Sequence, residues 1–133
     1  MQTDNRFSPD VVALLDQTDE VRIEPPSADG QPMQPVVIWV VVLDGRDVYV
    51  RSYRGVKGRW YQQLLKQPQH RGRLHVDQRA IPVRAVHIDD PEIIARVSDA
   101  FRKKYESKWP QETAEMLRDD VLPTTLRLDP DTP

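Results

Sequence analysis

The feature that most constrains the fold is an almost unbroken apolar run at residues 36–43, VVIWVVVL. Valine and isoleucine favour strands, and a strand without polar positions is buried on both faces or lines the inside of a barrel. The next two residues, Asp44-Gly45, favour a tight hairpin turn because glycine readily adopts positive φ. The sequence therefore predicts a buried strand over 36–43 that turns directly into a second strand.

The residues after this turn alternate between the two faces of a strand. Val48 and Val50 fall on one face, and Tyr49 and Arg51 fall on the other. This period of two predicts a strand that ends near Tyr53 and leads into a loop.

The loop that follows is basic and rich in glycine, with the sequence RSYRGVKGRWY at residues 51–61. Glycines let backbone N–H groups approach an anion closely, and arginine offers forked donors that fit phosphate oxygens. The start of a helix at the end of the loop adds a positive dipole. The segment therefore predicts a phosphate-binding loop, and the alternative that the residues leave open is a solvated basic loop with two turn glycines.

The distribution of charge also singles out this region. The net charge is only −2, yet residues 51–84 carry nine Lys and Arg and one acid, Asp77. The two ends of the chain carry the acidic residues. Such an asymmetry favours an anion-binding region on an otherwise acidic protein.

The rest of the chain supplies alternating helices and strands. Pro25–Gln34, with three prolines and a glycine, is expected to be a loop. Pro82, inside an expected strand, favours an edge position or a bulge. We expect helices that begin at Ser8-Pro9 and that cover 60–67, 91–105 and 111–121, and further strands at 20–24, 72–76, 79–88 and 123–128. The sum is about six strands and about four helices in a single α+β domain spanning residues 1–133.

Composition excludes several other classes. The chain has no cysteine, which excludes disulfides and thiol catalysis and fits a cytoplasmic location. No apolar run reaches the roughly 18 residues that a membrane span needs, and the polar first residues lack a signal-peptide core. His70, His75 and His87 have no partner at metal-ligand spacing, so no metal site is predicted.

The order of strand, Asp-Gly turn, strand, R-S-x-x-G-x-x-x-R-W-Y and helix resembles the flavin-binding split β-barrel superfamily. Within it, the chain is similar to the small deazaflavin- or FMN-dependent nitroreductase-like branch. That branch includes an uncharacterised domain-of-unknown-function family with the same I-W-V-V, Y-V-R-S and R-W-Y patterns. The resemblance runs from about residue 20 to residue 128 and is most specific over 49–61. It implies a six-stranded antiparallel split β-barrel with flanking helices.

The resemblance also implies a function, that of an oxidoreductase with a flavin-type cofactor, FMN or deazaflavin. The phosphate would lie at the basic loop, and the ring would lie against the barrel wall near Ile38. A homodimer with cofactor sites near the subunit interface is implied as well. The residues expected to bind the cofactor are Arg51, Ser52, Arg54, Gly55, Lys57, Gly58, Arg59, Trp60 and Trp39. Neither the resemblance nor the residues identify a substrate or a catalytic acid or base.

Two other functions stay open at this point. Relatives often carry basic residues in the loop that corresponds to Pro25–Gln34, and this chain has none there. That departure favours FMN over the multiply charged deazaflavin tail, and it leaves room for a cofactor-free structural or sensory partner. The aromatic residues around the basic loop also suit single-stranded nucleic acid, although the pI near 5.9 argues against that partner.

Overall fold

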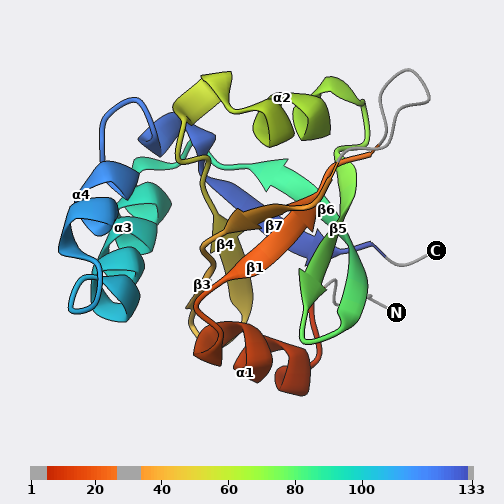
Figure 1. Cartoon of the computed structure of the whole chain (residues 1–133), viewed down its shortest axis with the longest axis horizontal. Coiled ribbons are helices and arrows are strands. Elements are labelled where there is room, and N and C mark those ends of the chain that lie inside the picture. Colours follow the sequence, from red (N-terminus) through yellow and green to blue (C-terminus); the bar gives the residue numbers. More distant parts are fainter. Residues whose placement is uncertain (1–5, 27–33, 132–133) are drawn as a thin grey trace.

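The computed structural model describes residues 6–26 and 34–131, which form one curved antiparallel sheet with four α-helices around it (Figure 1). The helices are α1 (Pro9–Gln17), α2 (Arg59–Lys66), α3 (Pro91–Tyr105) and α4 (Pro110–Met116), with 3-10 turns η1 (Gly55–Lys57) and η2 (Leu122–Thr124). The strands are β1 (Val21–Glu24), β2 (Val36–Ile38), β3 (Val41–Leu43), β4 (Asp47–Val50), β5 (Arg71–Val76), β6 (Arg79–His87) and β7 (Leu126–Pro130).

The strand order makes the sheet an open half-barrel. The order is β2-β1-β5-β6-β7-β4-β3, and every neighbouring pair is antiparallel. β2 and β3 stand at opposite ends of this order, yet only Trp39 and Val40 separate them in the chain. The sheet must therefore curve back until its two edges meet at this corner.

The apolar run over 36–43 is two strands rather than the one predicted, which raises the strand count from six to seven. The first part pairs with β1 and the second part with β4, so the chain changes partners at Trp39 and Val40. The alternation of faces continues through the break, because Ile38 and Val40 join the core inside the sheet while Val41 packs outside it. The hairpin prediction is confirmed, with Asp44 and Gly45 both at positive φ.

Two apolar cores explain why this run carries no polar residue. The inner core lies in the hollow of the sheet and includes Val48 and Val50, as the alternation predicted. The outer core lies between β3–β4 and the helices α3 and α4, and it includes Tyr49 and Phe101. β3 and β4 are therefore buried on both faces. In β1 and β5, by contrast, buried residues alternate with exposed or partly exposed ones.

Three further predictions needed correction. β6 is an interior strand and not the predicted edge strand. The Pro82 carbonyl accepts from Asp131 N, just beyond the end of β7. The Pro82 nitrogen faces the same side, where β7 has already ended, so the missing N–H is accommodated. The last strand begins at Leu126, because the Thr124 and Thr125 hydroxyls donate to Val121 O and Leu122 O and hold a 3-10 turn there. Helix α4 ends at Met116 instead of Val121.

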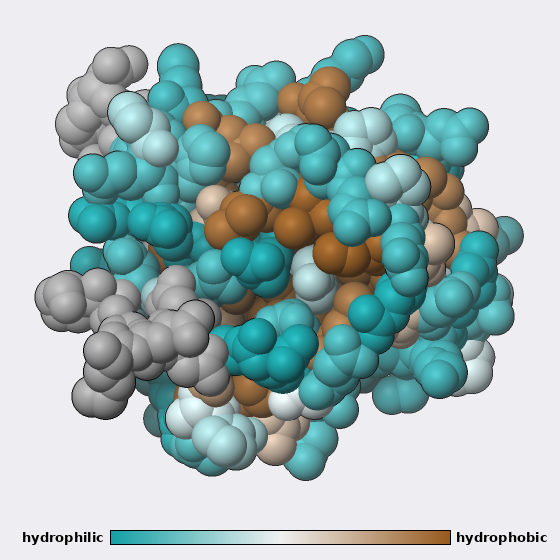
Figure 2. Space-filling view, turned by 180° about the vertical axis from the view of Figure 1, so that it is seen from behind, coloured by the Kyte–Doolittle hydropathy of each residue, from teal (hydrophilic) through white to brown (hydrophobic). Residues whose placement is uncertain are grey.

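The described residues also bear on other expectations. Within residues 6–26 and 34–131, no helix has the length and apolar character needed to cross a bilayer. In the same ranges, no three His, Cys, Asp or Glu side chains gather closely enough to hold a metal ion. The expected Pro25–Gln34 loop lies mostly outside the described residues. Figure 2 shows mainly hydrophilic side chains on the face opposite to that of Figure 1, with apolar side chains gathered near its middle.

Candidate functional site

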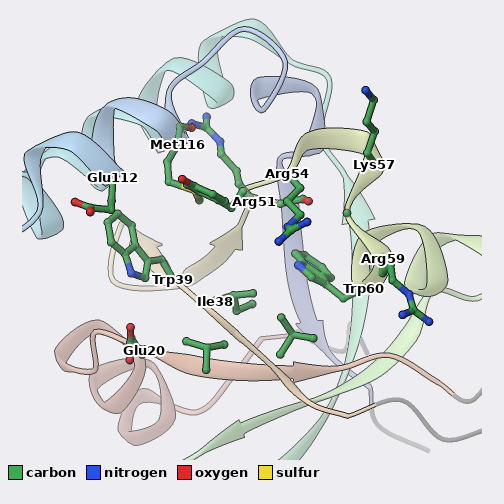
Figure 3. Close-up of a pocket in the computed structure, with 15 residues that line it drawn as sticks. Glu20, Ile38, Trp39, Arg51, Arg54, Lys57, Arg59, Trp60, Glu112 and Met116 are labelled. Atoms are coloured by element: carbon green, nitrogen blue, oxygen red, sulfur yellow. The ribbon is translucent and has the colours of Figure 1, made fainter.

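A cavity of about 570 Å³ opens between the corner of the sheet, the basic loop and helix α4 (Figure 3). Its volume falls within the range of small-molecule and cofactor sites. All nine residues predicted to bind a cofactor line it except Gly55. The other lining residues are Glu20, Val36, Val37, Ile38, Tyr53, Glu112 and Met116.

The floor and walls of the cavity are apolar and aromatic. Ile38 lies at the floor, with the Trp39 and Trp60 side chains on opposite sides of it in Figure 3. Trp60 is 6% exposed and meets Tyr61 edge-on, while Trp39 stacks on Tyr105 with the ring centroids 3.9 Å apart. Both indoles are therefore anchored by aromatic neighbours. We call the part of the cavity between them the slot.

Three cations of the basic loop form the polar rim of this slot. Arg54, Lys57 and Arg59 are exposed, and none of their side chains has a hydrogen-bond or ion-pair partner among the described residues. In Figure 3, Arg54 extends towards the cavity, whereas Lys57 and Arg59 extend away from it. The rim can therefore accept an anionic group without breaking an existing ion pair.

Arg51 belongs to the same loop but is built into the protein. It is 1% exposed, and its three guanidinium nitrogens donate to Thr125 Oγ1, Met116 O and Ile94 O at 2.9, 3.2 and 2.9 Å. Burial, with the nearby charge of Arg102, lowers the pKa of Arg51 to about 10, so it stays protonated near neutral pH. The structure gives Arg51 a role in joining the loop to α3 and α4, at the wall of the cavity.

Ser52 and the two glycines also serve the fold of the loop. The Ser52 hydroxyl donates to Gly55 O at 2.7 Å, and the Ser52 N–H donates to Thr124 Oγ1 at 2.9 Å. Gly55 has φ +69°, and a Cβ there would lie 2.8 Å from Asp120 O. A Cβ at Gly58 would lie 2.3 Å from the Ser52 hydroxyl. The glycines are thus explained by close packing within the loop and against the α4–η2 segment.

A comparison with known protein families identifies the family of this chain. Residues 11–128 match the family described as "Uncharacterized protein conserved in bacteria (DUF2255)". The chain belongs to this family. No curated protein sequence matches it.

Two solved structures share the fold of this DUF2255 protein. The conserved hypothetical protein Rv2991 from Mycobacterium tuberculosis is 16% identical, with a TM-score of 0.60 over 99% of this chain and 85% of that one. The heme storage protein HutZ from Vibrio cholerae is 12% identical, with a TM-score of 0.65 over 96% of this chain and 92% of that one. At these identities the likeness supports a split-barrel-like fold and nothing finer.

Sequence reasoning missed the side of the cavity that α4 supplies. Glu112 and Met116 lie in a segment that was assigned only an apolar helix face, and Glu20 was assigned only to a strand. No spacing in the sequence relates α4 to a loop some 55 residues earlier. Met116 is tied to the loop through its backbone carbonyl, which accepts from Arg51 Nη1 at 3.2 Å.

Proposed function

We propose that this DUF2255 protein binds a flavin-type cofactor in the cavity and serves as an oxidoreductase. The observation that carries the proposal is the combination of an aromatic slot with a cationic rim whose side chains have no partner among the described residues. A flavin has a planar ring at one end and a phosphate at the other, and the two halves of the cavity match these two chemistries.

The side chains present fit such a group. The ring would lie in the slot between Trp39 and Trp60, and the phosphate would lie at the Arg54, Lys57 and Arg59 rim. When bound, a flavin would supply the transfer of electrons or hydride, while the protein binds it, orients it and limits its contact with water. Residues 25–34 hold no basic side chain for the multiply charged deazaflavin tail, so FMN is the preferred candidate over deazaflavin.

Heme is the second candidate, because the similar structure HutZ is described as a heme storage protein. A heme would also use the flat slot and could place its carboxylates at the rim. Two lining residues, Tyr53 and Met116, are of types that serve as axial ligands of heme iron, and none of the lining residues is a histidine. The lining therefore favours a flavin.

The test is a titration of the purified protein with FMN, with deazaflavin and with hemin in parallel. We expect saturable quenching of FMN fluorescence at a stoichiometry of one per chain. The matched control is the Arg54→Gln, Arg59→Gln double variant, which keeps hydrogen-bonding side chains but removes charge from the rim. We expect it to bind FMN at least tenfold more weakly, about 1.4 kcal/mol or more.

A folded protein that binds none of the three ligands would overturn the proposal. It would favour the alternative hypothesis of a cofactor-free structural or sensory partner. Saturable binding of hemin alone, with a Soret band, would replace flavin by heme in the same cavity. Binding of FMN with no effect of the double variant would move the site elsewhere.

We further propose that the protein is a homodimer. Val37, Tyr53 and Val56 are large apolar or aromatic side chains about half exposed, at 48%, 47% and 54%, and the first two line the cavity. A second copy packed there would cover them and narrow the cavity mouth. Sedimentation equilibrium decides the matter, and a monomer at micromolar concentration would contradict it.

A further inference from the structure

The corner where the sheet changes partners carries a second device, formed by residues that do not line the cavity. Trp39 and Val40 interrupt the pairing between β2 and β3, so the backbone groups of Val40 have no strand partner. A buried peptide group without a hydrogen-bond partner destabilises the folded state. The protein must therefore satisfy this peptide by other means.

The last turn of α3 satisfies it with two side chains. The Val40 N–H donates to the Tyr105 hydroxyl oxygen at 3.0 Å, and the Lys104 ammonium donates to Val40 O at 2.8 Å. The Tyr105 hydroxyl proton is in turn within reach of Asp19 O at 2.7 Å and Val40 O at 3.0 Å. Lys104 also donates to Leu15 O at 2.9 Å. The end of α3 thus makes the hydrogen bonds to Val40 that a neighbouring strand would otherwise make. Lys104 also links the corner to the end of α1.

The same tyrosine fixes the ring that walls the cavity. The Trp39 and Tyr105 rings are parallel to within 2° at a centroid distance of 3.9 Å, and Trp109 packs against both at 5.8 and 6.2 Å. Tyr105 is fully buried, so its ring has no freedom to follow a displaced indole. The plane and position of Trp39 are therefore set jointly by the stack and by the hydrogen bonds to the adjacent residue.

We propose that Tyr105 and Lys104 are positioning residues for the cavity, which hold Trp39 in the orientation that a flat ligand needs. Neither side chain is among the lining residues, so their effect on a ligand acts through Trp39 and Val40. The part of this inference that concerns ligand affinity rests on the proposed function. The part that concerns Trp39 does not.

The test uses Trp39 as its own reporter. The chain has three tryptophans, so Trp60→Phe with Trp109→Phe leaves Trp39 as the single one. In that background we expect Tyr105→Phe, which keeps the ring but removes the hydroxyl, to shift Trp39 emission to longer wavelength and to increase its quenching by acrylamide. Tyr49→Phe is the matched control, because Tyr49 is a buried tyrosine of the same outer core that is not among the residues lining this cavity.

Ligand affinity is then measured in the protein that retains all three tryptophans. We expect Tyr105→Phe to weaken FMN binding about five- to tenfold, while Tyr49→Phe leaves it within twofold. Lys104→Met is the second variant should Tyr105→Phe fail to fold, since it removes the ammonium but keeps the apolar stem. We expect the same changes from it in both measurements.

The outcomes separate this inference from the proposed function. Unchanged Trp39 emission and quenching in the folded variants would overturn the positioning role, whatever FMN does. A changed Trp39 signal in a protein that does not bind FMN would support the positioning role and sink the flavin proposal. A changed signal with unchanged FMN affinity would overturn the claim that the cavity depends on it.

Discussion

The basic residues of this protein include two sets that differ in burial and in hydrogen bonding, although members of both lie in one short loop. Arg51 is 1% exposed and donates to three groups of the fold, whereas Arg54, three positions later, is exposed and has no partner among the described residues. Lys104 resembles Arg51, because its ammonium donates to two backbone carbonyls of the fold. Lys57 and Arg59 resemble Arg54, because they are exposed. The comparison shows that basic residues in one short loop can be built into the fold or can stay exposed at the edge of a cavity.

The comparison predicts its largest effect at Arg51. Arg51→Met would leave Met116 O, Ile94 O and the Thr125 hydroxyl without their donor. We expect the free energy of unfolding to fall by about 3 kcal/mol, since each such group costs about 1–3 kcal/mol and some relaxation follows. Urea denaturation followed by circular dichroism measures it. A loss below about 1 kcal/mol would mean that Arg51 belongs with the rim cations.

Gly55 tests whether the loop backbone belongs to the buried set. Its φ of +69° and the 2.8 Å approach of a Cβ to Asp120 O predict that Gly55→Ala lowers the free energy of unfolding by about 2 kcal/mol. Because Gly55 does not line the cavity, we expect the substitution to affect folding more than ligand binding. Gly45→Ala is the control, because Gly45 has a similar φ and open space around it.

Lys104 is the buried cation that a moderate rise in pH can discharge. Burial lowers its pKa from 10.5 to about 8, despite the opposing influence of Asp16 and Asp19. The folded state therefore releases this proton before the unfolded chain does, so the free energy of unfolding should rise between pH 8 and 9.5, by about 1–2 kcal/mol. Urea denaturation at the two pH values measures the change. Lys104→Met should abolish it, and an equal rise in that variant would assign the effect to other groups.

The smallest effect on stability is expected at the rim. Arg54→Gln should change the free energy of unfolding by less than about 0.5 kcal/mol, because no protein group among the described residues depends on its charge. The same variant should weaken FMN binding, so the two measurements move independently. A clear loss of stability in Arg54→Gln would remove the distinction between the two sets of cations.

The sequence was a good guide where one local signal sufficed. The Asp44-Gly45 turn, the face alternation of β4 and the boundaries of α3 were all predicted. Eight of the nine residues that the sequence singled out line one cavity. The sequence failed where distant partners decide, as at the Trp39–Val40 break, which depends on Tyr105, and at Arg51, whose partners lie on three other segments.

The corner at Val40 also has a consequence for how the chain is made. The groups that complete it lie 64 and 65 residues further along the chain, on Lys104 and Tyr105. During synthesis, the segment most prone to pair with other strands therefore leaves the ribosome long before the helix that shelters it. Nascent chains would expose an apolar strand with open edges for that interval, which is a hazard for aggregation. The charged residues Asp44, Arg46 and Asp47, directly after the run, are placed to limit that hazard until α3 arrives.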